Sequence, residues 1–226
     1  MQVGNEKEVA AFFPFWNKLS DRQQADILRQ MTERVFPKGS VLRPYGDEGD
    51  CVGLVLVREG HLRAFILSEA GKEITLYRLF PLDICLFSAS CIMRNIQFDI
   101  QVQAEKETTA WLIPVQLYDG LMQQSLAVTD FTNQLMSSRF SDVMWTLDQF
   151  LSKSMDSRIA ALLLELSVIE GADTLTVTHE EIANQLGSAR EVITRLLKYF
   201  QEDGLLALSR GKIQLLDTAR LQNLAG

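Results

Sequence analysis

The 226-residue chain contains only three cysteines and two histidines, and it has no apolar run of the roughly 20 residues that a membrane-spanning helix needs. So few cysteines, in an odd number, argue against a disulfide-bonded scaffold. The first residues also lack the pattern of a signal peptide. We therefore expect a cytoplasmic protein that does not bind membranes. Two histidines, His61 and His179, are too few for the metal centre of a cupin-type enzyme. Without a glycine-rich phosphate loop or a nucleophile with a histidine partner, we also expect no catalytic activity.

Positive charge is scarce as well. The chain has 22 Lys and Arg against 29 Asp and Glu, a formal net charge of -7, which argues against a generally basic nucleic-acid-binding protein. Affinity for nucleic acid would have to come from a local group of cations and would depend steeply on salt. One such group lies near the carboxyl terminus: Arg190, Arg195, Lys198, Arg210 and Lys212.

Residues 178–201 have the pattern of two helices joined by a sharp turn. Thr178, followed three residues later by Glu181, is a capping-box start. Gly187 stands where a tight turn needs a left-handed backbone, and Ser188 is expected to cap a second helix from about Ala189 to Gln201. Helical spacing predicts these inward-facing residues: Ile182, Ala183, Leu186, Ile193, Leu196, Leu197 and Phe200.

The opposite face of the second helix carries Arg190, Glu191, Thr194, Arg195 and Lys198. An Arg side chain can bond guanine O6 and N7 together, and a Glu can accept from cytosine N4, so this face predicts a recognition helix for the DNA major groove. Two plainer interpretations stay open. Glu191 is also placed to complete a capping box with Ser188, and the face is also compatible with an ordinary solvated helix surface.

The segment 206–216 consists of two alternating apolar runs around Arg210-Gly211 and predicts a β-hairpin. A helix-turn-helix followed by a hairpin is a winged helix. Earlier in the chain, from Val35 to Pro114, short β-rich runs separated by turn residues predict a β-sandwich or jelly roll.

A long helical segment is predicted between these halves, from about Pro114 to Leu151, and residues 152–157 are expected to be a hinge. A stripe of apolar residues recurs there at alternating steps of four and three, which is typical of a coiled-coil seam: Met136, Phe140, Val143, Leu147 and Phe150. The stripe predicts a homodimer axis, because one winged helix contacts too few base pairs to be specific and a two-fold axis places two of them on one DNA face. The alternative is a helix packed on its own roll.

The chain resembles, over nearly its whole length, the cyclic-AMP receptor protein and fumarate-nitrate regulator (Crp/Fnr) family of bacterial transcription regulators. Arg190, Glu191 and Arg195 fall on the three base-contacting positions of the cyclic-AMP receptor branch, and Glu191-x-x-Thr194-Arg195 is similar to the Glu-x-x-Ser-Arg of the other branch. The resemblance implies an α+β fold in three parts: an effector-sensing β-roll with amino-terminal helices (1–113), a dimerisation helix (114–151) and a winged-helix DNA-binding domain (152–226).

The resemblance also implies partners and backbone contacts. The partners are double-stranded palindromic DNA, RNA polymerase and a second copy of the chain. The residues expected at the DNA backbone are Thr178, His179, Ser188, Lys198, Gly211 and Lys212. His179 and Ala189 depart from the Arg and Ser that contact phosphate in the cyclic-AMP receptor, so backbone anchoring should be weaker. A similar module that does not bind DNA is the alternative function, although the intact recognition face argues against it.

The effector is not defined by the sequence. Members that bind nucleotides have an Arg-Ser pair for the cyclic phosphate where this chain has Phe98 and Asp99, so cyclic AMP is not expected. The first cysteine is Cys51, so the amino-terminal cluster that holds an iron–sulfur centre is missing. The open alternatives are a small, largely hydrophobic ligand, a thiol switch or haem site at Cys85 and Cys91, and mere filling of the roll. The candidate pocket residues are Cys85, Phe87, Ser88, Cys91, Phe98 and Asp99.

Overall fold

The computed structural model describes residues 6–42, 52–68, 71–86 and 100–226. The chain divides into two compact units, one of residues 1–66 with 76–143 and one of residues 67–75 with 144–226. This division into units does not test the domain boundaries predicted at residues 113 and 151, which stay predictions. Within the described residues, no helix is long and apolar enough to cross a membrane.

The first unit contains the predicted β-roll, which is built from two four-stranded sheets. Their orders are β1-β8-β3-β6 and β2-β7-β4-β5. The strands are β1 (Thr32–Phe36), β2 (Val41–Leu42), β3 (Leu54–Glu59), β4 (Leu62–Leu67), β5 (Glu73–Leu79), β6 (Ile84–Cys85), β7 (Ile100–Ala104) and β8 (Thr108–Ile113). Strand β8 pairs antiparallel with both β1 and β3. Alternate side chains of β7 are buried, as expected for a sheet with one face against a core.

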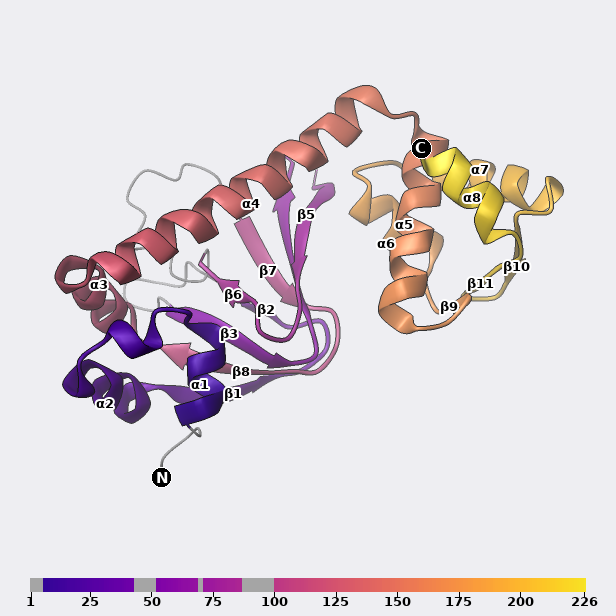
Figure 1. Ribbon diagram of the computed structural model, residues 1–226. Coiled ribbons are helices and arrows are strands. Elements are labelled where there is room, and N and C mark those ends of the chain that lie inside the picture. Colours follow the sequence, from indigo (N-terminus) through magenta and orange to yellow (C-terminus); the bar gives the residue numbers. More distant parts are fainter. Residues whose placement is uncertain (1–5, 43–51, 69–70, 87–99) are drawn as a thin grey trace. The chain divides into compact units, whose positions relative to one another are not determined.

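Amino-terminal helices cover the first sheet, beside β1 and β8 in Figure 1. They are α1 (Glu6–Phe12), the 3-10 turn Trp16–Lys18 and α2 (Asp21–Gln30). Trp111 of β8 is fully buried, and its ring lies 5.9 Å from that of Phe12 of α1. Ser20 and Gln23 form a capping box that fixes the start of α2.

The long helical segment is two helices rather than one. Helix α3 (Val115–Gln124) ends at Ser125, which has extended dihedrals, and α4 runs from Leu126 to Ser152. The break is stabilised because the hydroxyl of Thr129 donates to the carbonyl of Met122, 2.7 Å away. A side-chain bond of this kind competes with the regular helical ladder. The helical segment predicted from about Pro114 to Leu151 is therefore interrupted at Ser125.

Residues of the predicted seam on α4 have different surroundings. Met136 and Val143 are half-buried against the cores of their own roll. Phe140 and Leu147 are exposed, and so are Met144 and Leu151, which are not part of the predicted seam. Phe140, Met144, Leu147 and Leu151 are spaced by four, three and four residues, so they form one apolar stripe along the helix. The dimer seam itself stays a prediction.

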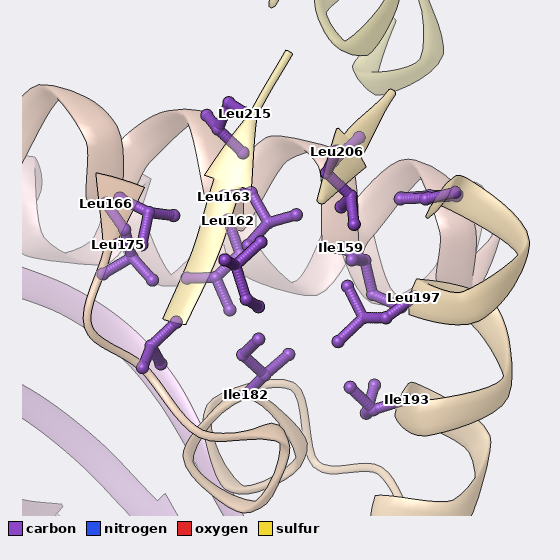
Figure 2. Close-up of a cluster of buried hydrophobic side chains, with 14 of the residues drawn as sticks. Ile159, Leu162, Leu163, Leu166, Leu175, Ile182, Ile193, Leu197, Leu206 and Leu215 are labelled. Carbon is purple, nitrogen blue, oxygen red and sulfur yellow. The ribbon is translucent and has the colours of Figure 1, made fainter. Parts of the chain in front are cut away.

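The second unit contains the predicted winged helix. Its elements are α5 (Met155–Glu170), β9 (Thr174–Leu175), α6 (His179–Gln185), α7 (Arg190–Glu202), β10 (Leu206–Ser209), β11 (Lys212–Leu215) and α8 (Thr218–Ala225). Figure 2 shows the core of this unit, where Ile182, Ile193 and Leu197 of the two-helix motif pack with Ile159 of α5. Residues 153 and 154 alone separate α4 from α5, within the segment expected to be a hinge.

Candidate nucleic-acid interface

The first helix of the motif, α6, begins as predicted. The Thr178 hydroxyl accepts from the Glu181 N–H at 3.1 Å, and the Glu181 carboxylate accepts from the Thr178 N–H at 2.7 Å. This reciprocal pair satisfies two backbone donors that the helix start would otherwise leave without partners. Ile182 and Ala183 of α6 are fully buried against α5 and α7.

The turn between α6 and α7 is held by backbone bonds. Gly187 has φ +62°, a left-handed conformation that favours glycine, and the Ser188 N–H donates to the Ala183 carbonyl at 2.9 Å. Arg158 of α5 adds a bond from its guanidinium to the Leu186 carbonyl at 2.7 Å. The position of α7 relative to α6 is therefore fixed by three independent features of the turn.

The predicted cap of α7 was wrong by one residue. Ala189, with extended dihedrals, is the N-cap, and no side chain caps the helix. Ser188 instead closes the preceding turn through its own N–H, so its hydroxyl stands one position too early. The alternative in which Glu191 completes a capping box with Ser188 is thereby removed.

The two faces of α7 are separated as the sequence predicts. Ile193, Leu197 and Phe200 are fully buried, whereas Arg190, Glu191, Arg195 and Lys198 are exposed and Thr194 is half-buried. A hollow along the outer face is lined by Arg190, Glu191, Thr194, Arg195, Lys198, Tyr199 and Glu202. Tyr199 and Glu202 were missed, because the spacing argument followed only the charged residues nearest the helix start.

A groove lies between the start of α6 and the hairpin β10–β11. Its walls are residues 177–180, Arg190 and residues 209–213. The groove thus brings together four residues expected at the DNA backbone, Thr178, His179, Gly211 and Lys212, from segments more than 30 positions apart. Ser188 and Lys198 do not line it. The predicted hairpin is present, and its register places Ser209 opposite Lys212 across the Arg210-Gly211 turn.

Two charged side chains of the outer face of α7 are without partners. In the part of the chain that the structure describes, the side chains of Glu191 and Arg195 make no hydrogen bond or ion pair. Arg190 Nε lies 4.0 Å from a Glu180 carboxylate oxygen, but both side chains are more than half exposed, so this pair contributes little. Donors and an acceptor for base edges are therefore available on α7.

His179 contacts α7 directly. Its Nδ1 lies 3.0 Å from the Thr194 hydroxyl oxygen. Burial, and then the positive charges of Arg190 and Lys198, lower the pKa of His179 below its ordinary value. The ring is therefore neutral over a wider pH range than a free histidine.

Of the candidate effector residues, only Cys85 lies in the described part of the chain. It is 1% exposed in β6, within the core between the two sheets. Such burial is typical of a cysteine that packs as a small hydrophobic residue. Phe87, Ser88, Cys91, Phe98 and Asp99 lie outside the described residues, so the pocket and the thiol pair stay predictions.

The two helices α6 and α7 bury their inner faces, the outer face of α7 exposes Arg190, Arg195 and Lys198, and the hairpin follows as a wing. This arrangement defines a winged-helix DNA-binding protein. Comparison with known proteins agrees, since residues 157–224 match the Crp-like helix-turn-helix domain and residues 33–125 match the cyclic nucleotide-binding domain. The transcriptional activator protein Anr of Pseudomonas aeruginosa is 30% identical over 214 residues, covering 90% of this chain and 85% of the relative. FnrA of Stutzerimonas stutzeri is 31% identical over 217 residues, with coverage of 90% and 85%.

A solved structure is more similar still. A crystal structure from Eubacterium rectale, described as a transcriptional regulator of the Crp/Fnr family, is 52% identical, covers 95% of this chain and 98% of that chain, and superposes with a TM-score of 0.91. The chain belongs to the Crp/Fnr family and is a DNA-binding transcription regulator of that type, not an enzyme. Regulators of this family bind DNA, typically as dimers.

Proposed function

We propose that this regulator binds an inverted repeat in double-stranded DNA as a homodimer and that an effector at the β-roll controls it. The proposal is supported above all by the outer face of α7, where Glu191 and Arg195 are exposed and, among the described residues, without a partner. The inner face of the same helix is packed into the core of the unit, so the exposed groups are presented on a rigid element.

Each residue of the surface then has a definite part in binding. Arg190 and Arg195 each donate to a guanine, and Glu191 accepts from the cytosine paired with one of them, so a G·C-rich half-site resembling TGTGA is expected. Thr194 contacts a neighbouring base. Thr178, His179, Ser188, Lys198, Gly211 and Lys212 position the protein on the sugar-phosphate backbone, which gives affinity without sequence preference. RNA polymerase is the expected protein partner of the bound dimer.

The base assignment is tested by a binding selection on randomised half-sites with wild type, Glu191→Ala and Arg195→Ala. Losing one bidentate contact costs about 1–3 kcal/mol, so each variant should relax the preference at its own base pair only. Lys212→Ala is the control, because losing a phosphate contact weakens binding to all sequences alike. If all four proteins select the same consensus with the same stringency, Glu191 and Arg195 are surface charges and the assignment is wrong.

The effector of the proposed switch is not cyclic AMP. Phe98 cannot pair with a phosphate and Asp99 would repel one, at the positions where the family's nucleotide-binding members hold it. Calorimetry on the dimer should therefore detect no binding of cyclic AMP in the micromolar range, and the nucleotide should leave DNA affinity unchanged. A micromolar Kd would overturn this part of the proposal. Mass spectrometry of ligands that co-purify with the protein separates a small apolar effector from a redox switch.

A further inference from the structure

The Thr194 hydroxyl has an unusual partner for a threonine inside a helix. Elsewhere in this protein, on α4, the Thr132 hydroxyl donates to the carbonyl of Val128 one turn earlier, at 2.8 Å. The Thr194 hydroxyl makes no such bond within the described residues, and its partner is Nδ1 of His179 at 3.0 Å. The direction of the Thr194 O–H is therefore set by the histidine of α6 and not by the backbone of α7.

We propose that His179 is a positioning residue that sets whether Thr194 offers a base a hydrogen-bond acceptor or a donor, so that the base preferred at this position changes with pH. The inference rests on the proposed contact between Thr194 and a base. It gives His179 a part in specificity, beyond the contact with the DNA backbone.

The chemistry follows from the two states of the imidazole ring. In the neutral ring with its proton on Nε2, Nδ1 accepts the Thr194 proton, and the hydroxyl oxygen is left with lone pairs only. It can then accept from adenine N6 or cytosine N4. In the protonated ring both nitrogens are donors, so Thr194 must accept from Nδ1 and turn its own proton outward. It can then donate to guanine O6 or N7, or to thymine O4.

The charges around His179 decide the pH at which its ring changes from neutral to protonated. Arg190 and Lys198 of α7 add to burial in lowering the pKa of the ring. Arg210 and Lys212 of the hairpin line the same groove, and Glu180 of α6 is the one carboxylate among the residues that line it. The free protein therefore holds His179 neutral near pH 7. DNA phosphates in the groove would raise the pKa of His179 toward the ordinary value, so the donor state should be reached in mildly acidic solution.

The experiment is the half-site selection repeated with the full-length chain at about pH 8 and about pH 5.5, on either side of the ordinary histidine pKa. Wild type should prefer a different base at one position at the two pH values, by roughly fivefold or more in relative affinity. Thr194→Val, which keeps the shape and removes the hydroxyl, should lose the preference at that position at both pH values. The positions assigned to Glu191 and Arg195 should not change.

Two substitutions of the histidine separate positioning from simple packing. His179→Asn keeps a polar atom close to Nδ1 but cannot titrate, so it should retain a preference that no longer depends on pH. His179→Phe keeps a ring and loses the hydrogen bond, so it should lose the preference at the Thr194 position alone. A uniform loss of affinity in both variants, with a salt slope reduced by about one and the consensus unchanged, would make His179 a phosphate contact only and overturn the inference.

Failure of this inference can be told apart from failure of the proposed function. If Glu191→Ala and Arg195→Ala change the consensus while His179→Phe does not, α7 contacts bases and only the part assigned to His179 is wrong. If none of these variants changes the consensus, the base-contacting assignment fails and this inference fails with it.

Discussion

Glu105 is a carboxylate that lies among three buried side chains of the roll, Arg78, His61 and Arg63. Its oxygens lie 2.8 Å from Arg78 Nε, 3.3 Å from His61 Nε2 and 3.6 Å from Arg63 Nε. The side chains of Arg78 and Arg63 are 3% and 5% exposed, so each needs a counter-charge to remain buried. Burial by itself raises the pKa of Glu105, but the bond from His61 and the positive charges of Arg78 and Arg63 outweigh it and lower the pKa to about 2.

The stability of the roll should therefore fall in acid because of this one carboxyl. Its pKa in the folded state lies below the unfolded value, so the stabilisation is complete above about pH 5 and is lost as the pH falls toward 2. A shift from 4.5 to about 2 corresponds to on the order of 3 kcal/mol. Glu105→Gln should unfold at lower urea concentration at pH 7 and show a flatter dependence on pH below 5, as monitored by fluorescence of the buried Trp16 and Trp111.

Glu107→Gln is the matched control for this change, since Glu107 is exposed two positions later in the same loop. If both variants show the same acid dependence as wild type, Glu105 does not hold the cluster together.

Which residue roles could be predicted depended on the distance along the chain between partners. The Thr178–Glu181 cap and Gly187 are local features, and both were predicted correctly. The cap of α7 was misplaced because the turn uses the Ser188 N–H for a bond back to Ala183, which no capping pattern indicates. The Glu105 cluster was not predicted at all, because its members come from two strands and from loop positions far apart in the sequence and carry no local signal.

Among the elements, α4 carries an apolar stripe that the described part of the chain leaves exposed. Phe140 is 67% exposed and Leu151 is 79% exposed, with Met144 and Leu147 between them on the same face. The seven-residue repeat was a sound guide to the existence of this face. Met136 and Val143 of the predicted seam are half-buried against the roll, because a repeat in sequence does not tell which of two neighbouring rows meets the core. The seam that includes them stays a prediction.

We expect Leu147→Glu to dissociate the dimer. Each buried Leu contributes about 1.5–3 kcal/mol, and the seam would contain this residue from both copies, so two charges would be placed in an apolar contact. Sedimentation should show a monomer with an unchanged helical circular dichroism spectrum. Ser138→Glu is the control, because Ser138 is exposed on α4 away from the stripe and should leave the dimer intact.

Val143→Glu provides the contrasting result for the same helix. Val143 packs against the core of the roll, so this change should lower the free energy of unfolding rather than only separate the copies. A Leu147→Glu protein that still sediments as a dimer would show that the exposed stripe is not the seam.

At the scale of the whole molecule, a chain with net charge -7 still gathers five cations along two hollows of its second unit, Arg190, Arg195 and Lys198 of α7 and Arg210 and Lys212 of the hairpin. The sequence was enough to predict the α+β class, the roll and the winged helix, because each has its own periodicity and turn pattern. It was not enough for the effector. Phe98 and Asp99, which replace the family's phosphate-binding pair, argue against cyclic nucleotides but do not indicate another ligand. Apolar residues of the same composition can line a pocket or simply fill the core of a roll.

The operator spacing tests the molecule as a dimer with two recognition helices. Two copies of α7 related by a two-fold axis should contact half-sites one helical turn apart, about 34 Å, on one face of the DNA. Inserting about five base pairs between the half-sites rotates one of them to the opposite face of the DNA, so wild-type affinity should fall at least tenfold. The Leu147→Glu variant, which is expected to be a monomer, should bind weakly and equally at every spacing. Fluorescence anisotropy between 50 and 200 mM salt measures how the affinity depends on spacing and on salt. The steep loss of affinity with salt should be the same at all spacings, because it comes from the cationic groups of each α7 and hairpin. Equal wild-type affinity at all spacings would mean that each copy binds alone, and the inverted-repeat operator would have to be abandoned.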